Sequence, residues 1–233
     1  MARAGLGYVV EVPESELKHC VAKYIDTGTA ETHRLYLARR TVLEMLRDRG
    51  YGVGDSEIEM SLAEFRTKFG ESLSQNLLER LRFSASRVSS PSQKVLVVFC
   101  GTDEIRKQAM STLLLQFSHD GSRPRIILVL QNKMNSHARK LAAESSFQIE
   151  TFLITDLLVN ITKHLLLPKH EILTPEEQQD LLKKLDVKPS QMPRILETDA
   201  IVKYYGLEKG QILKVTYEGP SSTGPFVTYR CVM

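Results

Sequence analysis

The chain has 233 residues and a mass of 26.4 kDa, enough for one large domain or two small ones. Its hydrophobic content of 42% and charged content of 25% are ordinary for a globular protein and exclude a wholly disordered chain. No apolar run approaches the roughly 20 residues that cross a bilayer, so a membrane protein is not expected. The net charge of +3 is too small for a protein that binds nucleic acid strongly on its own.

Three cysteines stand far apart in the sequence, at Cys20, Cys100 and Cys231, and none belongs to a CxxC pair. This spacing fits a reducing compartment and argues against a disulfide framework or a zinc site. The sequon Asn160-Ile161-Thr162 is therefore expected to carry no glycan.

The first predicted helix follows an N-terminal extension, residues 1–28, that mixes short apolar stretches with glycine and proline. Apolar residues at helical spacing predict this helix from Thr29 to the vicinity of Gly50. Its arginines indicate a solvated face or a surface for acidic partners: Arg34, Arg39, Arg40, Arg47 and Arg49. Ser61 and Glu64 then have the spacing of a capping box, which predicts a short helix that Gly70 ends.

The next stretch alternates predicted strands and helices. A half-buried strand is expected over residues 81–85, and buried strands over 95–99, 126–130 and 149–154. Helices are expected over residues 103–117, 136–145 and 156–164. This order is typical of an α/β domain with a largely parallel sheet and covering helices, here residues 29–164.

Residues 165–233 have a different pattern, which predicts a small α+β domain. Thr174-Pro175-Glu176-Glu177 combines a cap, a proline at the first helical position and a capping-box glutamate, so a helix is expected to residue 185. Pro189 and Pro193 bracket an extended segment. Thr198 or Asp199 is expected to cap a short helix that Gly206 ends. Residues 211–217 and 226–232 alternate like paired strands joined by the loop 219–224.

No catalytic constellation emerges from the sequence. Residues 99–103 lie where a strand meets a helix, but one glycine without a Gly-Lys-Ser/Thr ending indicates an ordinary turn capped by Thr102 or Asp103. Cys100 is expected to be inert packing, and His164 and His170 to have a surface or hinge role. We therefore expect no catalytic residue, metal, cofactor or small-molecule substrate.

An ordered series of motifs resembles the C-terminal domain of the fifth-largest subunit of eukaryotic nuclear RNA polymerases, a subunit with an archaeal counterpart. The series consists of residues 173–177, Pro193-Arg194-Ile195, Tyr204-Tyr205-Gly206-Leu207, Lys209-Gly210-Gln211 and Thr228-Tyr229-Arg230. Residues 45–51, 128–132 and 155–161 resemble the first half of the same subunit. Departures such as Ala200 after Asp199, together with residues 159–164 and the ending around Cys231, are most like the plant form that serves RNA polymerase V.

The resemblance implies a non-catalytic, nuclear subunit of a DNA-dependent RNA polymerase. Residues 29–164 would form a jaw domain near downstream DNA, and residues 165–233 an assembly domain that anchors to the largest subunit. In polymerase V the product would be non-coding transcripts for RNA-directed DNA methylation. The assembly interface implied by the motifs consists of Arg194, Tyr204, Tyr205, Gly206, Gly210, Gln211, Tyr229 and Arg230.

The resemblance also places a loop and helix start beside the downstream duplex: Lys133, Asn135, Ser136 and His137. A helix N-terminus offers free N–H groups and partial positive charge to phosphate, and Lys133 adds a full charge. The contact would be weak and limited to the DNA backbone. Asn135 or Ser136 can equally serve as the helix cap, which does not exclude that contact.

Three alternatives stay open at this stage. The same subunit can belong to RNA polymerase II or be shared among nuclear polymerases. A free-standing α/β nuclease-like enzyme would need clustered acidic residues at strand ends, whereas Asp103, Glu104 and Asp156 are scattered in sequence. The arginine-rich helix, residues 34–49, can also dock regulatory proteins as an adaptor.

Overall fold

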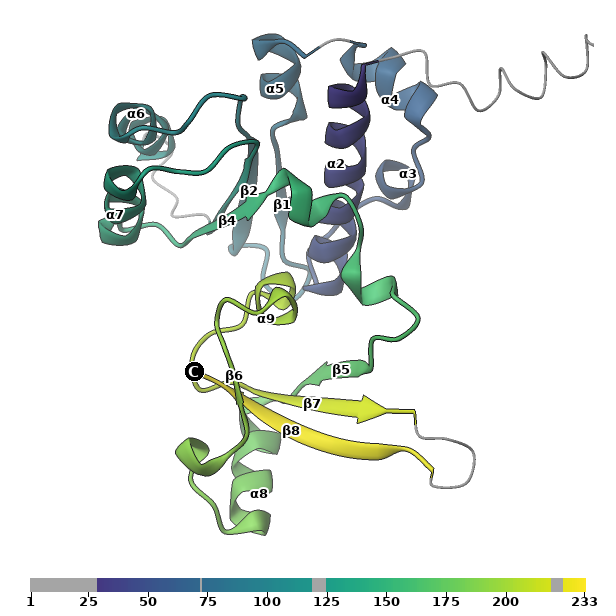
Figure 1. The fold of residues 1–233 in the computed structure, drawn as a ribbon, viewed down its shortest axis with the longest axis vertical. Helices are drawn as coiled ribbons and strands as arrows, with labels where there is room; N and C mark the ends of the chain where they lie inside the picture. The colour runs from purple at the N-terminus through teal and green to yellow at the C-terminus, as the bar shows by residue number, and fades with distance from the viewer. Residues whose placement is uncertain (1–28, 72, 119–124, 219–223) are drawn as a thin grey trace, which may run out of the picture.

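The computed structural model describes residues 29–71, 73–118, 125–218 and 224–233, and its two β-sheets divide the chain into two halves (Figure 1). The N-terminal half runs from helix α2 to strand β4, and the C-terminal half from strand β5 to strand β8. Each half carries a four-stranded sheet. The expected extension 1–28 and most of the predicted 219–224 loop lie outside the described residues.

The N-terminal half contains six helices among the described residues: α2 (Ala30–Asp48), α3 (Asp55–Ile58), α4 (Leu62–Phe69), α5 (Gln75–Leu81), α6 (Lys107–Ser118) and α7 (Ser136–Glu144). Its strands are β1 (Phe83–Ser86), β2 (Lys94–Phe99), β3 (Arg125–Leu130) and β4 (Ile149–Leu153). Strands β2, β3 and β4 are parallel, while β1 pairs antiparallel with β2 at the edge. The largely parallel sheet expected from the sequence is confirmed.

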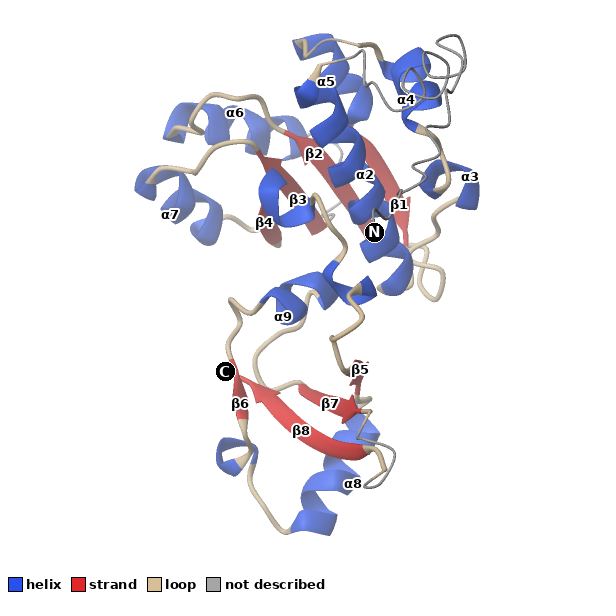
Figure 2. Ribbon diagram, turned by 45° about the vertical axis from the view of Figure 1, so that its right-hand side comes forward, coloured by secondary structure: helices blue, strands red, loops and turns tan. Residues whose placement is uncertain are grey.

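Helices cover both faces of this sheet (Figure 2). Because side chains alternate along a strand, Val97 and Ile127 pack against α2, α4 and α5, whereas Val98 and Leu128 pack against α6 and α7. The expected capping box of α4, between Ser61 and Glu64, is confirmed. Helix α2 is capped by Thr29, whose side chain accepts from the N–H of Thr32.

Two predicted elements of the N-terminal half are wrong in extent. The helix expected from residue 103 begins only at Lys107, because Ile105 first pairs with Met134 in a parallel β-bridge. Thr102 and Asp103 therefore lie in the loop and cap no helix. The strand expected over residues 81–85 begins at Phe83, since Leu81 ends helix α5, which Ser74 caps.

The helix expected over residues 156–164 is also wrong. Two single 3-10 turns, Ile154–Leu157 and Ile161–Lys163, replace it. Asn160 has an extended backbone conformation between them, and its side-chain oxygen accepts from the N–H of Thr162. Its amide nitrogen donates to Glu44 and Tyr204, at the junction of the two halves.

The C-terminal half has the strand order β5-β7-β8-β6. Its elements are β5 (Lys169–Ile172), α8 (Pro175–Leu185), β6 (Arg194–Ile195), α9 (Ala200–Tyr205), β7 (Ile212–Tyr217) and β8 (Phe226–Val232). Helix α8 with its capping box, helix α9 with its Asp199 cap, and the β7–β8 pair are confirmed. The segment expected to be extended between Pro189 and Pro193 instead contains a 3-10 turn, Pro189–Gln191.

Helix α9 joins the hydrophobic cores of the two halves. Ile201 and Val202 pack in the C-terminal core, while Tyr204, which is 4% exposed, packs in the core of the N-terminal half. Gly206 ends the helix at φ +63°, the left-handed conformation that glycine adopts without strain. No described helix is both long and apolar enough to cross a membrane.

A buried polar network crosses the same junction. The Asn160 amide nitrogen donates to Glu44 Oε2 at 2.8 Å and to Tyr204 Oη at 3.1 Å, while Lys163 Nζ lies 2.6 Å from Glu44 Oε1. The Tyr204 hydroxyl in turn donates to Asp48 Oδ2 at 2.7 Å. A glycan on the Asn160 amide would replace one of the two N–H groups that make these bonds. Helix α2, the segment after β4 and helix α9 are thus held together by hydrogen bonds.

Replacing the helix cap Thr174 tests the start of α8. We expect Thr174→Ala to lower the free energy of unfolding by about 1 kcal/mol, because the Glu177 N–H loses its acceptor. Urea denaturation measures the difference. Thr112→Ala is the matched control, since Thr112 is exposed in the middle of α6 and caps nothing. An equal effect of both substitutions would contradict the prediction.

The stability of the protein is expected to fall in acid partly through Glu44. Burial raises the pKa of this carboxyl, but hydrogen bonds from Lys163 and Asn160 outweigh burial and bring the pKa below its ordinary value of 4.5. The stabilisation is therefore present above pH 4.5 and is lost as the pH falls through the lower, folded-state pKa.

Glu44→Gln should lower the free energy of unfolding at neutral pH. It should also flatten the dependence of that free energy on pH below about pH 5, because in the wild type this carboxyl takes up a proton in that range. Urea denaturation from pH 7 down to pH 3, about the range of carboxyl titration, gives the two curves. Glu144→Gln, at an exposed carboxylate of α7, serves as the control. Parallel curves for wild type and Glu44→Gln would show that this carboxyl does not drive the acid loss.

Candidate functional site

The residues expected near DNA lie at the edge of the N-terminal sheet where α6 and α7 begin, called here the helix-start edge. Lys133, Ser136 and His137 are exposed there. Asn135 caps α7, because its Oδ1 accepts from the N–H of Ala138 at 2.7 Å. The Ile105–Met134 bridge joins this loop to the loop before α6. The four residues are therefore close together, and Asn135 has a structural role as well.

Further cations share this edge. Because β2 and β3 are parallel, the helices that follow them begin at the same side of the sheet, and Arg106 and Lys107 are exposed at the start of α6. Asp103 and Glu104 lie in the adjoining loop and lower the local positive charge. Sequence reasoning missed Arg106 and Lys107, although the predicted parallel order of the strands was the signal that would have placed them here.

The residues expected at an assembly interface fall into two groups. Tyr204 is buried, and Tyr205 and Gly206 are partly buried, at the junction with the N-terminal half. Arg194, Gly210 and Arg230 are exposed on the C-terminal half, whereas Gln211 and Tyr229 are partly buried. Gln211 Oε1 accepts from the N–H of Glu208, and Tyr229 packs toward α8. Some of the predicted interface residues therefore make contacts within the chain, and others face solvent.

Exposed apolar side chains gather at another part of the C-terminal half. At the end of the β7–β8 pair next to the connecting loop, the rings of Tyr217 and Phe226 stack at 4.6 Å with an interplanar angle of 5°. Tyr217 also lines a groove of about 770 Å³ with Leu165 and Leu166, which are 96% and 83% exposed. Exposed apolar side chains that gather in this way commonly mark a protein interface. The leucine run after His164 was the overlooked sequence signal.

The two histidines that flank the predicted boundary differ in environment. His164 is exposed, and its Nδ1 accepts from the N–H of Leu166 at 3.2 Å, which shapes the leucine run. His170 lines the groove on strand β5. Burial lowers the pKa of His170, and the Arg230 charge lowers it further, while the Pro168 carbonyl and Asp199 act in the opposite direction.

Two arginines expected on a solvated face of α2 are buried instead. Arg39 pairs with Glu57 through a side chain that is only 8% exposed, and Arg49 pairs with Glu150 through one that is 4% exposed. Arg34 and Arg47 remain exposed. The expectation of an arginine-rich docking face is therefore wrong for Arg39 and Arg49, because their charges are neutralised within the chain.

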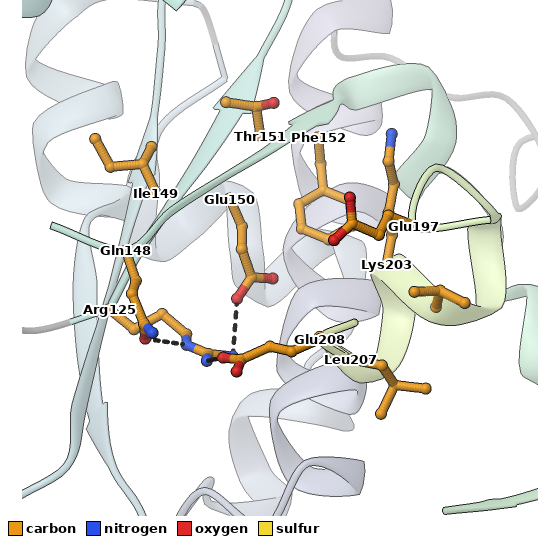
Figure 3. Close-up of a pocket in the computed structure, with 12 residues that line it drawn as sticks. Arg125, Gln148, Ile149, Glu150, Thr151, Phe152, Glu197, Lys203, Leu207 and Glu208 are labelled. Atoms are coloured by element: carbon orange, nitrogen blue, oxygen red, sulfur yellow. Dashed lines mark hydrogen bonds and ion pairs between the residues drawn. The ribbon is translucent and has the colours of Figure 1, made fainter. Parts of the chain in front are cut away.

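Arg49 belongs to a four-residue charge cluster between the halves, formed by Arg49, Arg125, Glu150 and Glu208. Figure 3 shows Arg125 reaching Glu150 and Glu208, with both ion pairs at 3.2 Å. Arg125, Glu150 and Glu208 border a cleft of about 420 Å³ between β4 and α9. The charges of these three side chains are already paired with one another, which leaves them with little need of a ligand.

Groups that a hydrolytic enzyme would use do not converge among the described residues. Burial raises the pKa of the Cys100 thiol to about 12, so this cysteine is a thiol and a poor nucleophile at neutral pH. Within the part of the chain that the structure describes, no three His, Cys, Asp or Glu side chains gather as metal ligands. Asp103, Glu104 and Asp156 are exposed.

Comparison with known proteins identifies the family. Residues 29–117 match the family described as RNA polymerase Rpb5, N-terminal domain, and residues 159–232 match RNA polymerase Rpb5, C-terminal domain. DNA-directed RNA polymerase V subunit 5C of Arabidopsis thaliana is 46% identical over 233 residues, 100% of this chain and 98% of the relative.

Two further relatives extend the comparison. DNA-directed RNA polymerase V subunit 5A of Arabidopsis thaliana is 47% identical over 91% of this chain and 94% of its own length. DNA-directed RNA polymerases I, II, and III subunit RPABC1 of Caenorhabditis briggsae is 34% identical over 87% of this chain and 97% of its own length. With both domains matched and identity above 40% along its full length, the chain belongs to the Rpb5 family of RNA polymerase subunits.

Proposed function

We propose that the chain is a non-catalytic subunit of a nuclear RNA polymerase, and that its host is RNA polymerase V. The observation that carries this proposal is its full-length similarity to Arabidopsis proteins named as polymerase V subunits, at 46% and 47% identity. The polymerase would make non-coding transcripts used in RNA-directed DNA methylation. The raised pKa of Cys100 and the scattered acidic residues support a role without chemistry of its own.

Other hosts are the second candidate, and named relatives favour them. One relative is named as a subunit of polymerases IV and V, at 45% identity, and the more distant RPABC1 as a subunit of polymerases I, II and III. Purification through this chain from nuclei, followed by mass spectrometry of the largest subunit, distinguishes these hosts. The proposal predicts the largest subunit of polymerase V. Recovery of a nuclease activity without any polymerase subunit would instead support the free-standing enzyme.

We further assign a role to each part of the chain. Residues 29–164 are proposed to form a jaw domain whose helix-start edge lies beside downstream DNA. Residues 165–233 are proposed to form the assembly domain that binds the largest subunit. Two features support this division: Arg194, Gly210 and Arg230 are exposed on the C-terminal half, and Leu165 and Leu166 are exposed in the groove that Tyr217 lines. An interface would bury both kinds of group.

Arg230 tests the assembly role. The side chain is exposed on β8, and no ion pair joins it to another described residue. A guanidinium buried and paired across an interface contributes on the order of 2–4 kcal/mol. Arg230→Ala should therefore weaken co-purification with the largest subunit and leave the melting temperature of the free chain nearly unchanged. Arg34→Ala, at an exposed arginine of α2, is the control.

The opposite result would contradict the proposed role of Arg230. If Arg230→Ala lowers the melting temperature and leaves co-purification intact, the residue stabilises this chain and is not at the interface. Loss of co-purification in Arg34→Ala would place the arginine-rich helix at the interface instead.

Lys133 tests the DNA contact in the assembled polymerase. We expect Lys133→Glu to weaken retention on a downstream duplex and to lower the salt slope of binding by about 1, equally for all sequences, because the lysine meets phosphate. Asn135 stays unchanged in this test since it caps α7. Lys184→Glu, the same charge change at an exposed position of α8, is the control.

Retention measured across a range of salt concentrations decides the question. Identical retention of wild type and Lys133→Glu at every concentration would mean that the helix-start edge faces away from DNA. A loss shared equally by Lys184→Glu would show a general effect of negative charge.

A further inference from the structure

We propose that Arg49 is a positioning residue that locks the N-terminal half to the C-terminal half, so that the two sheets move as one body. A partner that binds the C-terminal half would then also fix the orientation of the helix-start edge. The biological meaning of this lock rests on the proposed function, whereas the lock itself is a property of the free chain.

One guanidinium joins the end of α2 to two other elements, β4 and α9. Arg49 follows the last residue of α2, and its Nη1 and Nη2 donate to the two oxygens of Glu150 on β4 at 3.1 and 2.8 Å. Its Nε donates to the Tyr204 carbonyl at 2.8 Å, and Nη2 also donates to the Lys203 carbonyl at 2.6 Å. These carbonyls end helix α9, where the partial negative charge of the helix favours a cation.

Arg125 and Glu208 extend the contact across the junction. Arg125 Nη1 lies 3.2 Å from Glu150 Oε1, and its Nη2 lies 3.2 Å from Oε1 of Glu208, two residues beyond Gly206 (Figure 3). Glu150 therefore accepts from two arginines, one directly after α2 and one at the start of β3. The end of α2, two strands and the end of α9 thus meet in one charge cluster.

The backbone at Gly206 leaves no space for another side chain. A Cβ at this position would lie 2.9 Å from Arg49 Cζ and 3.1 Å from Arg125 Nη1. The left-handed φ of +63° also favours glycine here. The close approach of α9 to both guanidiniums is thus built into the chain, and any rotation of the halves would separate Arg49 from several acceptors at once.

Because the Arg49 side chain is buried, the loss of any of these hydrogen bonds would be costly. With 4% of its side chain exposed, the guanidinium has little water to replace a lost acceptor. Lysine has no planar fork and cannot reproduce the bidentate bond to Glu150 together with the two carbonyl bonds. Helix α9 adds apolar contact on the same side, because Tyr204 packs in the N-terminal core.

A distance measurement on the full chain tests the lock. Spin labels at Lys140→Cys on α7 and Lys184→Cys on α8 report the separation of the halves, with Cys20→Ser to avoid an additional label. Cys100 and Cys231 are buried. Pulsed dipolar spectroscopy should give one narrow distribution for the wild type. Arg49→Lys and Glu150→Gln should each broaden it or split it, while circular dichroism keeps its folded spectrum.

Arg39→Lys is the matched control, because the buried Arg39–Glu57 pair lies wholly within the N-terminal half. It should lower stability and leave the distribution narrow. If the Arg49 and Glu150 variants do not fold, the milder Arg125→Glu and Glu208→Arg variants replace them, since Glu208 is 65% exposed. Glu208→Arg should broaden the distribution because it removes the Arg125–Glu208 pair, and Arg125→Glu should broaden it more because it also removes the pair with Glu150.

Three results would overturn the lock. They are a broad distribution in the wild type, a narrow one in folded Arg49→Lys and Glu150→Gln chains, and equal broadening in Arg39→Lys. None depends on the polymerase, so they are separate from failure to co-purify with its largest subunit, which bears on the proposed function alone.

Discussion

The burial of the Arg49 charge is the constraint on which the junction depends. A guanidinium removed from water is tolerated only where hydrogen-bond acceptors replace the lost hydration, and removing one partner of such a pair costs about 3–5 kcal/mol. Arg49 meets Glu150 and two carbonyls of α9. The requirement to neutralise one charge therefore fixes the end of α2, the start of β4 and the end of α9 relative to one another.

Helix α9 is short, and its stability comes from packing on both sides rather than from its length. Ile201 and Val202 pack in one core, Tyr204 packs in the other, and Asp199 and Gly206 define the two ends. The motif that identified the family from sequence is thus partly an internal junction. Its tyrosine and glycine serve contacts between the halves, while Arg230 remains exposed on the neighbouring sheet.

Local signals in the sequence predicted most elements, and long-range contacts explain the failures. The capping boxes at Ser61 and Thr174 and the apolar strand cores depend on neighbours within a few residues, so the pattern was sufficient. Asn160, in contrast, bonds Glu44 from 116 residues away, and that bond holds an extended residue where a helix was expected. Arg49 binds Glu150, which is 101 residues away in the sequence, and no residue near Arg49 in the sequence indicates that its side chain is buried.

The arrangement is also consistent with the proposed place of this weakly basic chain beside downstream DNA. The helix-start edge and α8 lie toward opposite ends of the molecule in both views (Figures 1 and 2). Lys133, Arg106 and Lys107 provide a few exposed cations beside two acidic residues, too few to hold a duplex without help. In the proposed role, such an edge would contribute to DNA binding only when it is held in place, because so weak a contact does not offset the entropy lost on binding. The proposed lock at Arg49, whose side chain is buried and paired, would provide that rigidity inside the chain and leave the exposed groups of the C-terminal sheet available for the proposed partner.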